Sequence, residues 1–161
     1  MIYEDRFKPE EIEALLRIKS MLKVSDRVLD YIIAYIGYES NFNPYAQHKI
    51  SKAGVSSGYI AYLASVLKKY HITPKKLSLL PPVNQILFLG TYLYPHRHKL
   101  NSLENVVGVL IDPKFIDANI NDNVYNSKLQ YKYFILGGLL PLGKIYTEVK
   151  FIYTQGVTNG R

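Results

Sequence analysis

The stretch that decides the fold is "YIIAYIGYESNFNPYAQHKISKAGVSSGYIAYL", residues 31–63. An apolar, tyrosine-rich run leads into the pair Glu39-Ser40. A loop rich in Asn, Ser and Gly follows over residues 41–58, and a second apolar run begins after it. Such a composition predicts a helix that ends near Glu39, a bend, and a further element that returns to the core.

Glu39 continues the apolar face of the predicted helix. Residues that share this face lie three, four, seven and eleven positions before it: Ile36, Tyr35, Ile32 and Val28. We expect a carboxyl in this position to be partly desolvated, which raises its pKa. A carboxylic acid that keeps its proton near neutral pH suits general acid catalysis, as in the glycosidases. The alternative is a glutamate at a frayed helix end that points into water.

Composition restricts the class of protein. The chain has 161 residues, a hydrophobic content of 48% and a net charge of +7, which predicts one domain with a core of its own and a polyanionic partner. Nucleic acid, an anionic cell wall and a membrane surface all fit the charge. The sequence contains no glycine-rich phosphate loop and no arginine cluster, so it disfavours nucleic acid as a partner.

The sequence predicts neither a cofactor nor a metal site. It contains no cysteine, so zinc would need histidine and carboxylate ligands. His96 and His98 flank a cationic arginine and point in different directions on a helix. Asp117, Asn119 and Asn121 have the spacing of a calcium loop, but Asp122 stands where the turn glycine is needed.

No targeting segment is predicted. The polar start "MIYEDRFKPEE" does not read as a signal peptide, and no apolar run is long enough to span a membrane. If the target lies outside the cytoplasm, we therefore expect delivery by another route.

Helical periodicity with capping residues predicts five helices. Their expected ranges are 8–22, 25–38, 59–70, 82–93 and 102–112. The segment 73–82, "TPKKLSLLPP", is predicted to be a turn region. Residues 129–156 are apolar but interrupted by Gly-Gly and Pro, which favours helices while leaving strands open.

Two motifs resemble a known superfamily. "ESNFNPYA" (39–46) followed by "AGVSSGYIAYL" (53–63) resembles the lytic transglycosylases and goose-type lysozymes. "PPVNQILFLGTYLYPHRHKLNSLENVVGVLIDP" (81–113) is closest to the lysozyme-like modules of bacteriophage tail proteins. The resemblance implies a mainly α, lysozyme-like domain. It divides the chain into an N-terminal helical segment (1–24), a core (25–116) and a C-terminal extension (117–161).

The resemblance also implies site residues. Glu39 takes the position of the catalytic acid, Ser40 supplies the hydroxyl beside it, and Gly58 is a turn glycine next to the sugar cleft. The implied partners are bacterial peptidoglycan and other tail or baseplate proteins. The implied location is the virion, which would carry the enzyme to the cell wall.

Departures from the family pattern concern the cleft. Ala61 stands where the family usually has a glutamine that lines the cleft, and the late Ala-Tyr-Asn motif is absent. Ser40, Gly58, Tyr59, Tyr62 and Tyr92 are assigned to substrate binding. Tyr59 or Tyr62 would replace the missing cleft contact, and Tyr92 matches the tyrosine of the helix pattern in the phage modules. Two functions stay open: cleavage of peptidoglycan glycan strands with Glu39 as general acid, or an inactive structural virion protein that keeps the fold.

Overall fold

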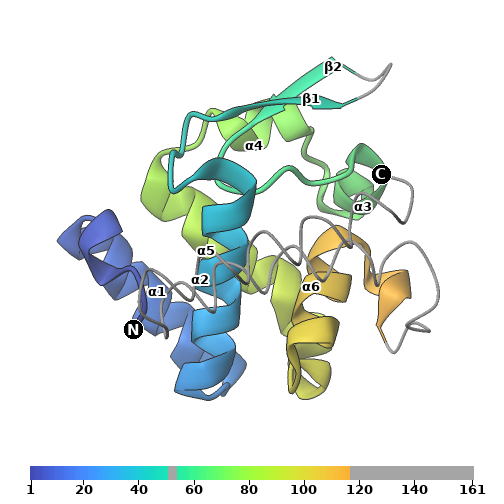
Figure 1. The fold of residues 1–161 in the computed structure, drawn as a ribbon. Coiled ribbons are helices and arrows are strands. Elements are labelled where there is room, and N and C mark those ends of the chain that lie inside the picture. Colours follow the sequence, from blue (N-terminus) through green and yellow to red (C-terminus); the bar gives the residue numbers. More distant parts are fainter. Residues whose placement is uncertain (51–53, 117–161) are drawn as a thin grey trace, which may run out of the picture.

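A computed structural model of the chain describes residues 1–50 and 54–116, which form a mainly helical structure (Figure 1). The α-helices are α1 (Pro9–Leu22), α2 (Asp26–Ser40), α3 (Ala64–Leu67), α4 (Pro74–Ser78), α5 (Pro82–Leu93) and α6 (Leu103–Ile111). Short 3₁₀ helices are η1 (Glu4–Arg6), η2 (Lys68–Tyr70), η3 (Tyr94–Lys99) and η4 (Pro113–Phe115). The strands are β1 (Gln47–Ile50) and β2 (Gly54–Ser57). The predicted mainly α class is therefore confirmed.

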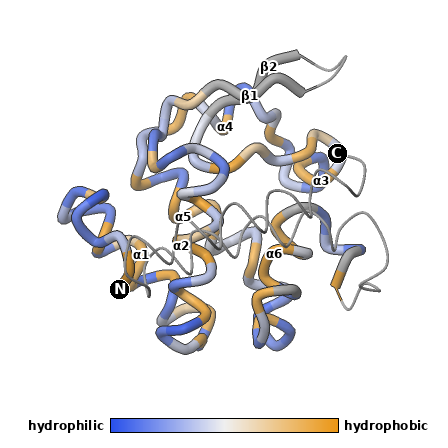
Figure 2. The backbone as a smooth tube through the Cα atoms, viewed as in Figure 1, coloured by the Kyte–Doolittle hydropathy of each residue, from blue (hydrophilic) through white to orange (hydrophobic). Residues whose placement is uncertain are grey.

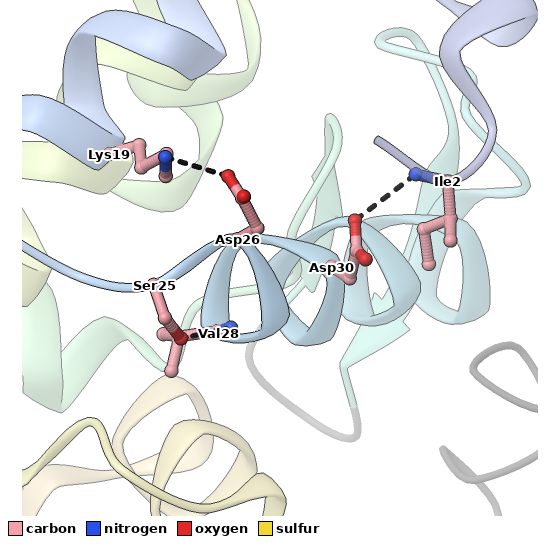
Figure 3. Close-up of polar contacts among 6 residues, drawn as sticks. All are labelled: Ile2, Lys19, Ser25, Asp26, Val28 and Asp30. Atoms are coloured by element: carbon pink, nitrogen blue, oxygen red, sulfur yellow. Dashed lines mark hydrogen bonds and ion pairs between the residues drawn. The ribbon is translucent and has the colours of Figure 1, made fainter.

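Helix α2 runs through the middle of the structure, with α1 on one side and α6 on the other (Figure 1). The Ser25 hydroxyl caps its first turn by accepting a hydrogen bond from the Val28 amide at 3.2 Å (Figure 3). Nine residues of the helix are buried. The helix ends where Asn41 adopts a left-handed conformation with φ 50°. It therefore extends two residues beyond the predicted end, and Glu39 lies in its last turn.

Helix α1 packs closely against α5. Pro9 occupies the first turn of α1, and the Glu11 carboxylate accepts a hydrogen bond from the Lys8 amide at 2.9 Å. On α5, a Cβ placed on Gly90 would lie 2.6 Å from Ile18 Cγ2. The two helices approach each other this closely because Gly90 has no side chain.

The predicted loop at 41–58 contains a short hairpin. Strands β1 and β2 pair antiparallel, with Gln47 opposite Ser57 and Ile50 opposite Gly54. The prediction missed the hairpin because its residues show no sustained alternation of apolar and polar side chains. The two strands pair through main-chain hydrogen bonds, which do not require particular side chains and so give no pattern in the sequence.

The third predicted helix is shorter than expected. It begins only at Ala64, and residues 58–63 precede it without helical structure. Tyr59, Ile60 and Tyr62 are buried in this segment, so tertiary packing determines its conformation rather than helical periodicity. Conversely, the predicted turn region 73–82 contains the short helix α4.

Helices α5 and α6 begin where the sequence predicts. Pro82 opens α5, and the Ser102 hydroxyl caps α6 by accepting a hydrogen bond from the Asn105 amide at 3.1 Å. One cluster of buried apolar side chains joins α1, α2, α5, α6 and the segment 58–63. The hydropathy of the chain follows this arrangement, with apolar stretches on the inner faces of the helices (Figure 2).

No helix within 1–50 and 54–116 has the length and apolar character needed to cross a membrane. The predictions for the C-terminal extension, including the discounted calcium loop at Asp117, Asn119 and Asn121, fall outside the described residues.

Candidate functional site

Glu39 is half-buried in the last turn of α2, at the end that faces the hairpin (Figure 1). The next side chain, Ser40, turns inward and donates a hydrogen bond to the Ile36 carbonyl at 2.8 Å. The chain then reverses through two residues with positive φ, Asn41 (50°) and Phe42 (63°). Glu39 therefore occupies a fixed helix end directly before a sharp turn.

Residues of the N-terminal segment hold this turn. The Phe42 ring is buried and packs against Tyr3 and Phe7, with ring centroids 5.0 Å and 5.5 Å away. The Arg6 guanidinium lies 4.8 Å from the centre of the Phe42 ring and donates to the Asn41 carbonyl at 3.2 Å. Sequence analysis missed this support, because nothing in the N-terminal residues signals a contact with position 42.

Gln85 of α5 holds the far side of the loop. Its side-chain nitrogen donates to the carbonyls of Pro44 and Leu80, each at 3.1 Å, and its oxygen accepts a hydrogen bond from the Tyr59 amide at 2.9 Å. Gly58, with φ +120°, lets the chain pass close to this amide, since a Cβ there would lie 2.7 Å from Gln85 Oε1. The resemblance included Gln85 but gave it no role.

The structure places Tyr59 in the core, 4% exposed. Its hydroxyl donates a hydrogen bond to the Glu11 carboxylate. Burial, together with the negative charge of Glu11, raises the pKa of Tyr59 well above the ordinary value.

Tyr62 is also buried, 5% exposed, with its ring edge-on to Phe88 and Tyr92. Burial, with smaller contributions from Tyr92 and Tyr70, raises its pKa. Tyr59 and Tyr62 both line a small cavity of about 10 Å³, which is room for about one water molecule. Their assignment to substrate binding stays a prediction, and their burial disfavours direct contact with a sugar.

Tyr92 links α5 to α6. Its hydroxyl donates to the Val109 carbonyl at 2.6 Å, and its side chain is 1% exposed. Burial raises its pKa, with Asp112 and Tyr70 contributing. This position gives Tyr92 a structural task in joining the two helices.

Two further titratable side chains, Asp112 and His96, lie far from Glu39 in the sequence. Asp112 is half-buried and caps η4 by accepting a hydrogen bond from the Lys114 amide at 3.1 Å. His96 lies on η3 with a buried Nε2 atom, and burial next to Lys69 lowers its pKa. Within the described part of the chain, no three histidine or carboxylate side chains come together in the way a metal ion requires.

Glu39 offers a carboxyl group beside a turn that is anchored from two directions. A single carboxylic acid can act as a proton donor, whereas the two-carboxylate mechanisms of many glycosidases need a second group at a defined distance. Compared with models of protein families, with curated proteins and with solved structures, the chain gives no match.

Proposed function

We propose that the protein cleaves the glycan strands of peptidoglycan, as a lytic transglycosylase or muramidase, with Glu39 as the general acid. The observation that carries the proposal is the position of Glu39: half-buried, at the end of an apolar helix, before a turn held in place by Phe42 and Gln85. The sequence around it, "ESNFNPYA", supports the same assignment through its resemblance to transglycosylases.

In this mechanism Glu39 gives its proton to the oxygen of the glycosidic bond as the bond to the anomeric carbon breaks. The N-acetyl group of the substrate assists departure of the leaving sugar. Attack by the sugar's own hydroxyl then yields an anhydro product, and attack by water yields a hydrolysed one. Either route returns a proton to Glu39, so one carboxyl group is sufficient.

The resemblance to lysozyme-like modules of phage tail proteins supports a place in the tail or baseplate of a virion. The net charge of +7 suits contact with an anionic cell wall. The partners proposed are therefore peptidoglycan and neighbouring tail proteins.

Digestion of purified peptidoglycan, followed by mass analysis of the soluble fragments, tests the activity. We expect Glu39→Gln to lower the rate by roughly 10²–10⁴-fold, because the amide keeps the shape of the side chain but cannot donate the proton of an acid. Glu13→Gln, the same change at an exposed position of α1, is the matched control. Anhydro fragments, lighter by one water, distinguish the transglycosylase from the muramidase.

A second candidate is a catalytically inactive structural protein of the virion. The burial of Tyr59 and Tyr62 favours it, because both rings fill the core instead of facing a sugar. Ala61, in place of the family glutamine, points the same way. Release of no soluble fragments by the folded wild-type protein would support this candidate and exclude the enzyme.

A further inference from the structure

A second cavity lies around the opposite end of α2, where the helix begins. Its volume is about 390 Å³, within the range of small-molecule sites. The polar residues that line it are Lys23, Ser25, Arg97, His98 and Asn101. They come from the turn between α1 and α2, from η3 and from the start of the segment before α6, so the cavity joins parts of the chain that are far apart in sequence.

The charge of the lining has one sign. Lys23, Arg97 and His98 supply cationic or protonatable nitrogen atoms, and none of the described residues that line the cavity is a carboxylate. The nearest acidic side chain in sequence, Asp26, pairs with Lys19 at 2.7 Å (Figure 3). Lys19 therefore offsets the negative charge of Asp26.

Arg97 is held in place before any ligand arrives. Its guanidinium lies 4.0 Å from the centre of the Tyr94 ring, and its Nη1 atom donates to the Tyr94 carbonyl at 2.9 Å. A guanidinium has five N–H donors in a planar fork that matches the oxygens of a phosphate. Because these two contacts with Tyr94 restrict the guanidinium, less conformational entropy is lost when it binds an anion.

The first turn of α2 adds to the positive potential. Ser25 and Val28 both line the cavity, so the positive end of the helix dipole lies at its wall. Helix α2 has 15 residues, long enough for this contribution. The helix end and the three basic side chains therefore favour the same kind of ligand.

We infer that this cavity binds a phosphate group through Arg97, Lys23 and His98. A phosphomonoester and the phosphodiester of a polymer share this chemistry. The site is independent of the proposed function, because the length of α2 separates it from Glu39 by about 20 Å.

The inference is tested by adding inorganic phosphate to the full chain and recording the amide chemical shifts by NMR at each concentration. We expect shifts to concentrate at residues 23–28 and 97–101. Lys23→Gln and Arg97→Gln should each weaken phosphate binding about tenfold. Arg97→Lys should weaken it less, since it keeps the charge but loses the fork. Lys75→Gln, an equal change of charge on α4, is the control and should bind phosphate as the wild type does.

A second titration with glycerol phosphate and with a glycerol-phosphate oligomer distinguishes the source of the phosphate. Tighter binding of the oligomer identifies a polymer ligand, and equal binding identifies a monoester. Glu39→Gln should leave every one of these affinities unchanged, whether or not the protein cleaves glycan. The inference is overturned if phosphate shifts no amide at the cavity, or if Lys75→Gln weakens binding as much as Arg97→Gln does.

Discussion

The side-chain oxygen of Gln85 accepts a hydrogen bond from the Tyr59 amide at 2.9 Å, and the nitrogen of the same side chain donates to the Pro44 carbonyl at 3.1 Å. One buried amide of α5 thus serves both ends of the loop that follows Glu39. Gln85 therefore holds both ends of this loop against α5.

Gln85→Leu should lower the free energy of unfolding by roughly 2–4 kcal/mol, because it leaves several buried main-chain groups without partners while keeping a similar volume. Urea denaturation measures the change. Asn84→Leu, at the exposed neighbouring position, should change stability far less. Equal stability of the two variants would show that Gln85 does not hold the loop.

Gly90→Ala should destabilise the protein by about 1–3 kcal/mol, since the new methyl group would overlap the side chains of Ile18 and Met21. A double-mutant cycle with Ile18→Ala measures the coupling between the new methyl group and the Ile18 side chain. Removing the Ile18 side chain makes room for the methyl group, so the double variant should be more stable than the sum of the two single losses predicts. Additive losses would show that the Ile18 side chain is not the source of the loss of stability.

Alkaline pH should destabilise the fold through Tyr59, Tyr62 and Tyr92. Their pKa values are raised in the folded state. Above the ordinary tyrosine pKa of about 10, the unfolded chain releases protons that the folded chain retains, so stability falls as pH rises. It falls by about 1.4 kcal/mol per pH unit for each such group. Below pH 10 this contribution is fully present.

Urea denaturation between pH 9 and pH 11.5 measures this dependence on pH. Tyr59→Phe should reduce the slope by about one proton, because phenylalanine has no group to ionise. Tyr94→Phe, the same change at an exposed position, is the matched control. A slope unaffected by Tyr59→Phe would contradict the prediction.

Ala61→Gln should raise the release of peptidoglycan fragments severalfold if the protein is an enzyme. Ala61 is half-buried, and in the proposed resemblance to transglycosylases it stands where those enzymes have a glutamine. One added hydrogen bond to the sugar contributes about 0.5–1.5 kcal/mol. Ala61→Leu, which adds volume without an amide, is the control. No gain from Ala61→Gln in an active protein would remove position 61 from the cleft.

The sequence predicted those parts of the fold that local chemistry determines. Ser25 and Ser102 marked helix starts because a hydroxyl before an apolar run caps the first turn. The position of Glu39 near the end of a helix followed from the spacing of apolar residues before it together with the Asn- and Gly-rich loop after it. Helices α1, α2, α5 and α6 were therefore predicted close to their observed limits.

Contacts between distant segments escaped prediction. Tyr59 lies in a segment that reads as helical, yet its conformation depends on Gln85 and on Glu11, which belong to other helices. Phe42 likewise reads as a loop residue, although Tyr3 and Phe7 bury it. Long-range packing of this kind leaves no periodic pattern in a single sequence, so the anchoring of the turn after Glu39 could not be inferred.

Tyr59 is bonded to Glu11, 48 positions before it, and to Gln85, 26 positions after it. These two bonds come from α1 and α5, which themselves pack together. Local opening of the segment 58–63 therefore requires both helices to release it. The amide hydrogen of Tyr59, which donates to Gln85, should therefore exchange slowly with solvent, although the segment belongs to no helix or strand. Slow exchange at this position would then report that the segment 58–63 is held by both α1 and α5.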